Sequence, residues 1–155
     1  MGRIVKQFKN NRAIIDVVVG LPNNQNGIID IDRNKPMKDC KALIDTGSSM
    51  SFISMKLVKE LNLIPNGKIG FSNIYDKPKE VNLYEIFLGI KIDEKIRLDF
   101  EGKFDVVNNA FLIPIRAGSM DSKVFENEEY EVLLGVPEIA EGHLTISGNA
   151  FIFSI

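Results

Sequence analysis

The sequence predicts an all-β fold, either a barrel or a sandwich, on the strength of three observations. Short runs rich in β-branched and aromatic residues recur along the 155 residues, and Gly, Pro, Asn and Asp separate them. Only residues 54–62 have the apolar spacing typical of an amphipathic helix. No repeat of fixed period is present, and a chain of this length is typical of one domain. We therefore expect a single domain over residues 1–155.

The expected strands follow one another with short connections. In chain order they are residues 13–19, 40–44, 50–53, 68–75, 81–90, 95–100, 106–113 and 131–134. A closing hairpin is expected from residues 143–147 and 150–155, with Gly148 and Asn149 at its turn.

Helices and loops fill the remaining segments. Ser54 suits the N-cap of the helix at residues 54–62, and Leu57 and Leu61 lie on one of its faces. One helical turn is expected at residues 136–140, where a proline near the start is tolerated. Two polar stretches are expected as loops: residues 20–39, with a short extended piece at 27–31, and residues 119–129.

Composition excludes several classes of function. Lys and Arg number 19 and Asp and Glu number 21, so the net charge of −2 is no footprint for nucleic acid or an anionic membrane. The single cysteine, Cys40, excludes an internal disulfide framework and a cysteine-based zinc site. The one histidine, His143, is the only residue that could supply a Ser–His–Asp or Cys–His site. We expect no metal and no cofactor. The apolar run 14–19 is too short for a signal or a membrane span, so the expected location is the cytoplasm.

One stretch carries chemistry: Ala-Leu-Ile-Asp-Thr-Gly-Ser-Ser, at residues 42–49. An apolar strand delivers Asp45 onto a turn of small residues, where Gly47 permits unusual backbone angles and Thr46 and Ser48 supply hydroxyls. An ordinary Asx-turn at a strand end would have the same composition. The apolar runs on both sides favour a buried, functional turn over a surface one.

This stretch resembles the active-site signature of retroviral-type aspartic proteases, the retropepsins. The family's second signature, two apolar residues and a glycine before a short helix, resembles Leu133-Leu134-Gly135. The ending, from Gly142 onward, is similar to small bacterial members. Three features depart from the pattern. Pro137 stands where members often carry Asp, the loop at residues 20–39 is longer than the minimal fold needs, and the expected flap at residues 65–79 is poor in glycine.

The resemblance implies a closed retropepsin-like barrel with one or two short helices, and an aspartic endopeptidase that cleaves extended peptide or protein segments. Asp45, Thr46, Gly47 and Ser48 would form the catalytic turn. The resemblance also implies that Thr46 reaches across a two-fold axis and that Ser48 bonds to the outer Asp45 oxygen, which favours an acidic optimum.

Peptide hydrolysis by this route needs two carboxylates that share one proton. The chain has a single Asp-Thr-Gly, so we expect a two-fold homodimer with one Asp45 from each subunit. Residues Ile69, Gly70 and Phe71 are the expected flap residues over the substrate, although packing of an ordinary strand would explain them equally well.

Two other functions compete with this interpretation. The Asp45 stretch also resembles the first phosphate loop of actin-like and sugar kinases, but the chain is too short for two lobes and has no Gly-rich phosphate cradle. The second is an inactive relative, a dimeric retropepsin-like module used for binding or assembly. The sequence also leaves open whether residues 1–12 are a pro-segment.

Overall fold

The computed structural model describes residues 3–25, 28–32, 34–72, 78–92 and 110–155, so the strand expected at 95–100 lies outside the described residues. Its elements in chain order are β1 (Arg3–Gln7), β2 (Ile14–Gly20), β3 (Pro22–Gln25), β4 (Ile28–Ile31), β5 (Lys38–Ile44), β6 (Ser51–Ser54), α1 (Met55–Glu60), β7 (Gly67–Phe71), β8 (Lys79–Lys91), β9 (Ala110–Met120), α2 (Ser122–Phe125), β10 (Val132–Leu134), α3 (Val136–Ile139), β11 (His143–Ser147) and β12 (Ala150–Ser154).

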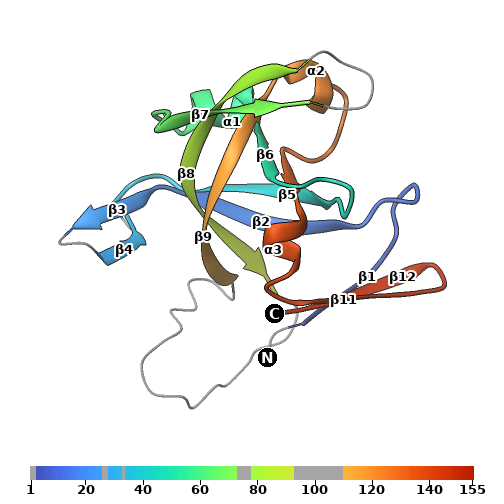
Figure 1. Ribbon diagram of the computed structural model, residues 1–155. Coiled ribbons are helices and arrows are strands. Elements are labelled where there is room, and N and C mark those ends of the chain that lie inside the picture. The colour runs from blue at the N-terminus through green and yellow to red at the C-terminus, as the bar shows by residue number, and fades with distance from the viewer. Residues whose placement is uncertain (1–2, 26–27, 33, 73–77, 93–109) are drawn as a thin grey trace.

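Six of these strands close into a barrel (Figure 1). The hydrogen-bonded order is β2-β5-β10-β6-β9-β8, and β8 pairs back onto β2. Two of the pairings are parallel, β10 with β5 and β6 with β9, and the others are antiparallel. The predicted all-β class is confirmed, and the barrel, rather than a sandwich, is the form that it takes. The described residues contain three short helices, where one or two were expected.

Strand register explains how the barrel separates two apolar clusters. Four residues that face one another across β2, β5, β10 and β6 are fully buried in the main core: Ile15, Ala42, Val132 and Ile53. The row one residue away points to the opposite side of the sheet, because side chains alternate along a strand. It contains Ile14, Leu43, Leu133 and Phe52, and it belongs to a second cluster that Phe125 and Tyr130 cover.

The helix expected at residues 54–62 is present as α1. The hydroxyl of Ser54 accepts the N–H of Leu57 at 3.1 Å, so the predicted N-cap is confirmed. Leu57, Val58 and Leu61 are all buried and attach the helix to the main core.

Both expected loops contain regular structure. Within residues 20–39, β3 and β4 pair as an antiparallel hairpin beside the barrel, in register from Pro22↔Ile31 to Gln25↔Ile28 (Figure 1). β4 matches the short extended piece expected at residues 27–31, whereas its partner β3, Pro-Asn-Asn-Gln, has no strand pattern of its own. Paired strands satisfy their backbone groups with each other whatever their composition. Within residues 119–129, β9 continues to Met120 and α2 follows, because Phe125 (7% exposed) anchors this stretch to the second cluster.

The first strand was not expected at all. β1 pairs with β12, and β11 completes a three-stranded sheet that lies apart from the barrel strands in Figure 1. Ile4 is fully buried with Phe151 and Phe153, and Phe8 packs against Phe151 with ring centroids 5.5 Å apart. Residues 3–8 are therefore part of the folded core, which argues against a dispensable pro-segment there.

Candidate active site

Residues 45–50 form a tight turn between β5 and β6, called here the Asp45 turn. The backbone N–H of Gly47 donates to Oδ1 of Asp45 at 2.9 Å, and the N–H of Ser48 donates to the Asp45 carbonyl oxygen at 3.2 Å. The first of these contacts is that of an Asx-turn, as the composition predicts. Asp45 is half-buried, whereas Thr46 and Gly47 are exposed. The turn thus presents a carboxylate whose orientation the backbone restrains.

Residues 134–136, from the second predicted motif, lie directly against this turn. The parallel pairing of β10 with β5 brings them there, although they come late in the chain. The N–H of Asp45 donates to the Leu134 carbonyl at 2.9 Å, and the N–H of Val136 donates to the Ser48 carbonyl at 2.9 Å. The 134–136 segment therefore holds the turn at both ends.

Gly135, in the middle of this segment, packs on the backbone of Met50. A Cβ added at Gly135 would lie 2.4 Å from the Met50 carbonyl oxygen and 2.5 Å from its carbonyl carbon. Only glycine allows the two backbones to approach so closely. This contact gives a physical reason for the glycine in the second motif.

Ser48 differs from what the resemblance implied. Its hydroxyl donates to the Met50 carbonyl at 2.7 Å and not to the outer oxygen of Asp45. A hydroxyl has one proton to donate, so in this arrangement the carboxylate does not receive it. The contact that Asp45 does receive within the turn is the Gly47 N–H. The role expected of Thr46 requires a second subunit and stays a prediction.

The carboxylate of Asp45 has no ion-pair partner among the described Lys, Arg and His residues. Its charge acts on a neighbour, Tyr130, which belongs to the second cluster. The pKa of Tyr130 is raised, first by burial and then by the Glu128 carboxylate; Arg12 opposes this rise and Asp45 adds to it. Arg12 also lies over the Tyr130 ring, 5.8 Å from its centroid.

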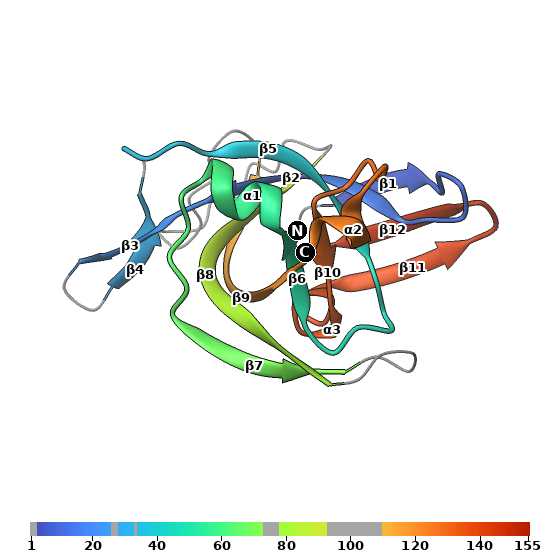
Figure 2. The same ribbon diagram turned by 90° about the horizontal axis from the view of Figure 1, so that it is seen from above.

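The expected flap is the ribbon of β7 and the first part of β8. Ile69 pairs with Val81 and Gly70 with Glu80, and the ribbon lies above the β5–β6 connection in Figure 1 and beside it in Figure 2. Ile69 is 39% exposed, and a Cβ at Gly70 would meet nothing within 4 Å. Residues 73–77, in the same expected flap, lie outside the described residues.

Phe71 has a different environment from its two neighbours. It is half-buried, and its ring meets that of Phe52 edge-on, with centroids 4.8 Å apart. Phe71 thus joins the ribbon to the second cluster, whose partly buried members include Met50 of the Asp45 turn. Packing therefore accounts for Phe71, while Ile69 and Gly70 remain accessible.

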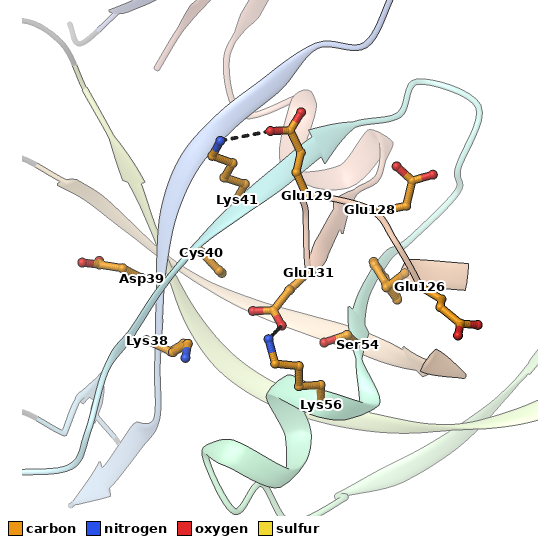
Figure 3. A pocket seen from close by; sticks show the side chains of 11 residues that line it. Lys38, Asp39, Cys40, Lys41, Ser54, Lys56, Glu126, Glu128, Glu129 and Glu131 are labelled. Atoms are coloured by element: carbon orange, nitrogen blue, oxygen red, sulfur yellow. Dashed lines mark hydrogen bonds and ion pairs between the residues drawn. The ribbon is translucent and has the colours of Figure 1, made fainter. Parts of the chain in front are cut away.

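A cavity of about 560 Å³ opens elsewhere, on the outside of β5 between α1 and the residues after α2 (Figure 3). Lys41 pairs with Glu129 at 3.1 Å and Lys56 with Glu131 at 2.8 Å across it. The cavity also includes Cys40, whose pKa burial raises to about 12, with the carboxylates of Glu131 and Asp39 adding to the rise. A thiol in this state is neutral and a poor nucleophile at neutral pH.

Three further observations concern the remaining candidates. His143 is exposed at the start of β11. Among the described residues, no three His, Cys, Asp or Glu side chains are grouped so that they could hold a metal ion. No helix in the described part of the chain is long and apolar enough to cross a membrane.

Sequence reasoning missed one polar pair behind the Asp45 turn, Ser51 and Glu138. The Ser51 hydroxyl donates to the Glu138 carboxylate and accepts the N–H of Gly135 at 2.9 Å. Ser51 is fully buried and Glu138 is 8% exposed. The available signal was weak: a small polar residue inside an apolar strand, and an acidic residue in a four-residue helix.

The protein is similar in structure to a retropepsin-like aspartic protease from Rickettsia conorii, at 14% sequence identity and a TM-score of 0.49. The alignment covers 98% of this chain and 89% of that one. No protein-family model matches the sequence, and no curated protein matches it. At this level of likeness, function has to be argued from the residues and their geometry.

Proposed function

We propose that this chain is an aspartic endopeptidase that acts as a two-fold homodimer, with one Asp45 carboxylate contributed by each subunit. The observation that carries the proposal is the Asp45 turn. A half-buried carboxylate without an ion-pair partner among the described residues stands on a turn that the 134–136 segment holds at both ends. Thr46 and Gly47 are exposed beside it and thus available to a second subunit.

The chemistry follows from two carboxylates around one water. Two like charges at close range cannot both ionise readily, so the pair holds one proton. The ionised Asp45 takes a proton from the water as its oxygen bonds to the scissile carbonyl carbon, while the protonated Asp45 donates to the carbonyl oxygen. The carbon–nitrogen bond then breaks. The amine nitrogen takes the proton that came from the water, and the other, ionised carboxylate takes a hydroxyl proton from the intermediate, which leaves a carboxylic acid, a free amine and one proton on the carboxyl pair. This scheme needs no metal.

The proposed substrate is an extended segment of polypeptide. β7 is the last strand in the sheet order, and no other strand of the described residues pairs with its outer edge. This edge is therefore available to an added strand. Gly70 leaves that edge open, and Ile69 offers an exposed apolar side chain on it. An extended peptide that pairs with this ribbon would lie over the Asp45 turn, with its backbone near the carboxylates.

The second candidate is the catalytically inactive module, and one observation favours it. The Ser48 hydroxyl donates to the Met50 carbonyl, so the Asp45 carboxylate does not receive the hydrogen bond from Ser48 that the resemblance implies. The actin-like alternative fits less well, since the described chain is built around one small β-barrel.

The test is cleavage of an unfolded protein from acidic to neutral pH by the parent, by Asp45→Asn and by Asp39→Asn. Asp39 is the matched control because it lies on β5, the strand that leads into the Asp45 turn, is exposed and pairs with Lys91 at 2.9 Å. We expect Asp45→Asn to lose at least about 10²-fold in rate, as for a general acid or base. Asp39→Asn should retain parental activity.

Concentration separates the dimer from other forms of the proposal. Specific activity of the parent should rise with protein concentration until the dimer is saturated, with a maximum below neutral pH. A folded, dimeric parent that cleaves nothing would favour the inactive module. Activity that survives in Asp45→Asn would overturn the proposed mechanism.

A further inference from the structure

Glu138 is a buried acidic residue that the proposed chemistry does not use. It is 8% exposed on α3, directly after the 134–136 segment. Burying a carboxylate is unfavourable unless hydrogen bonds compensate it. Its compensation is the hydroxyl of Ser51, which is fully buried at the start of β6. Such a pair requires an explanation beyond stability, because an apolar pair would fill the same space without a charge.

The same hydroxyl also serves the backbone. Ser51 Oγ accepts a hydrogen bond from the N–H of Gly135 at 2.9 Å. The Ser51 hydroxyl in turn donates a hydrogen bond to the Glu138 carboxylate. A serine hydroxyl is free to point its single proton in several directions. Because the Ser51 hydroxyl donates its hydrogen bond to Glu138, a lone pair of the Ser51 oxygen remains directed at the N–H of Gly135.

We propose that Glu138 is a positioning residue for Asp45 and acts through Ser51; the inference rests on the proposed function. The 134–136 segment meets the Asp45 turn through three consecutive residues. Leu134 accepts the N–H of Asp45 at 2.9 Å, and Val136 donates to Ser48 at 2.9 Å. The Glu138–Ser51 pair holds the N–H of Gly135, the residue between Leu134 and Val136. It thereby fixes the position of the 134–136 segment against the Asp45 turn.

The local chain leaves few other ways to make this support. Gly135 has no side chain and lies against Met50, so no group can be inserted at that point. Pro137 has no N–H to donate, although it stands where the resembling proteases often carry Asp. Glu138 is the next residue along, and its longer side chain reaches back to β6.

The test compares Glu138→Leu, which removes the acceptor, with Glu138→Gln, which keeps a carbonyl oxygen for Ser51. Glu141→Leu, at an exposed acidic residue just after α3, is the matched control. We expect Glu138→Leu to lower kcat by about 10- to 100-fold, as small displacements of reacting groups do, with KM nearly unchanged. Glu138→Gln should recover most of kcat, and Glu141→Leu should match the parent. A Glu138→Leu enzyme with parental kcat, or no recovery in Glu138→Gln, overturns the proposal.

A smaller change keeps the test valid if Glu138→Leu fails to fold. Ser51→Ala removes only the hydroxyl and should lower kcat by a similar factor. On that background, adding Glu138→Gln should change kcat by less than about twofold, because the two residues act as one unit. A full additional loss in the double variant would mean that Glu138 does not act through Ser51.

Amide hydrogen exchange distinguishes failure of this inference from failure of the proposed function. Ser51→Ala should speed exchange at Gly135, and also at Asp45 and Val136, in the full-length chain whether or not it cleaves peptides. If the parent is not a protease but these amides lose protection, the positioning role stands and the proposed function fails. If the parent is active and the amides of Asp45 and Val136 are unaffected, the positioning role is wrong.

Discussion

Replacing Gly135 with alanine tests the packing on which the candidate site depends. The new Cβ would lie 2.4 Å from the Met50 carbonyl oxygen, 2.5 Å from its carbonyl carbon and 3.0 Å from its Cα. Ordinary contacts between such atoms begin near 3.5 Å, so the backbones must separate by about 1 Å. All three neighbours are backbone atoms, and therefore no side-chain rotation can relieve the contact.

That separation acts on two hydrogen bonds. The bonds from Asp45 to Leu134 and from Val136 to Ser48 are both 2.9 Å long, and a shift of this size would stretch them beyond useful length. Each is worth about 1 kcal/mol net, and forcing a methyl group into a packed site costs a further ~1–3 kcal/mol. We expect a loss of about 3–5 kcal/mol in the free energy of unfolding, equivalent to a fall in Tm of about 6–20 °C for a chain of this size.

Thermal unfolding of Gly135→Ala is measured beside Gly70→Ala, which makes the same chemical change. A Cβ at Gly70 meets nothing within 4 Å, so that variant should melt close to the parent. Peptide cleavage is measured on the folded fraction of Gly135→Ala, where we expect a rate loss of about 10²-fold. If Gly135→Ala melts like Gly70→Ala and cleaves peptides like the parent, the 134–136 segment does not hold the turn in the way described.

Two further predictions use the charges around the barrel. Burial raises the pKa of Cys40 to about 12, so a thiol reagent at pH 7–8 should modify Cys40 far more slowly than it modifies a free thiol. After unfolding, the rate should reach that of a free thiol. Rapid modification of the native chain would contradict the burial of Cys40. The pKa of Glu129 is lowered by its hydrogen bonds to Lys9 and then to Lys41, so this carboxylate stabilises the fold above its ordinary pKa and the stabilisation is lost as pH falls through the lowered value. Tm should therefore fall on the acid side, and Lys9→Ala should flatten that fall; an unchanged slope would show that the pair contributes nothing.

The loss of this stabilisation at acidic pH bears on the proposed activity. Lys9 belongs to the N-terminal segment. Its partner Glu129 lies after α2 and precedes Tyr130, which covers the second cluster. A shared-proton mechanism favours acidic conditions, whereas this ion pair weakens there.

Local patterns in the sequence were sufficient for many elements of the fold. The run of Ile and Val in β2, the Ser54 cap of α1 and the Gly148-Asn149 turn of the closing hairpin are each determined by neighbours in the chain. The Asp45 turn was found for the same reason, since its Asp, Gly and Ser residues form contacts within two or three positions.

Other elements depend on partners that are distant in the chain. β1 has no distinctive pattern and exists because it pairs with β12. The exposed polar composition of residues 119–129 concealed the anchor Phe125, whose burial depends on Phe52 and its neighbours in the second cluster. Nothing near Ser48 in the sequence indicates that its hydroxyl donates to Met50 and not to Asp45.

The sequence by itself determined that this chain is all-β, and that a lone Asp45 stands on a tight turn between two apolar strands. It also identified Gly135 as part of a second motif, without a reason for it. Only the tertiary structure decided that β10 lies parallel to β5, that Gly135 rests on Met50, and that Glu138 reaches Ser51 behind the turn. The physical reason is range: a turn is set by bonds between neighbouring residues, whereas its orientation is set by a strand that arrives some ninety residues later.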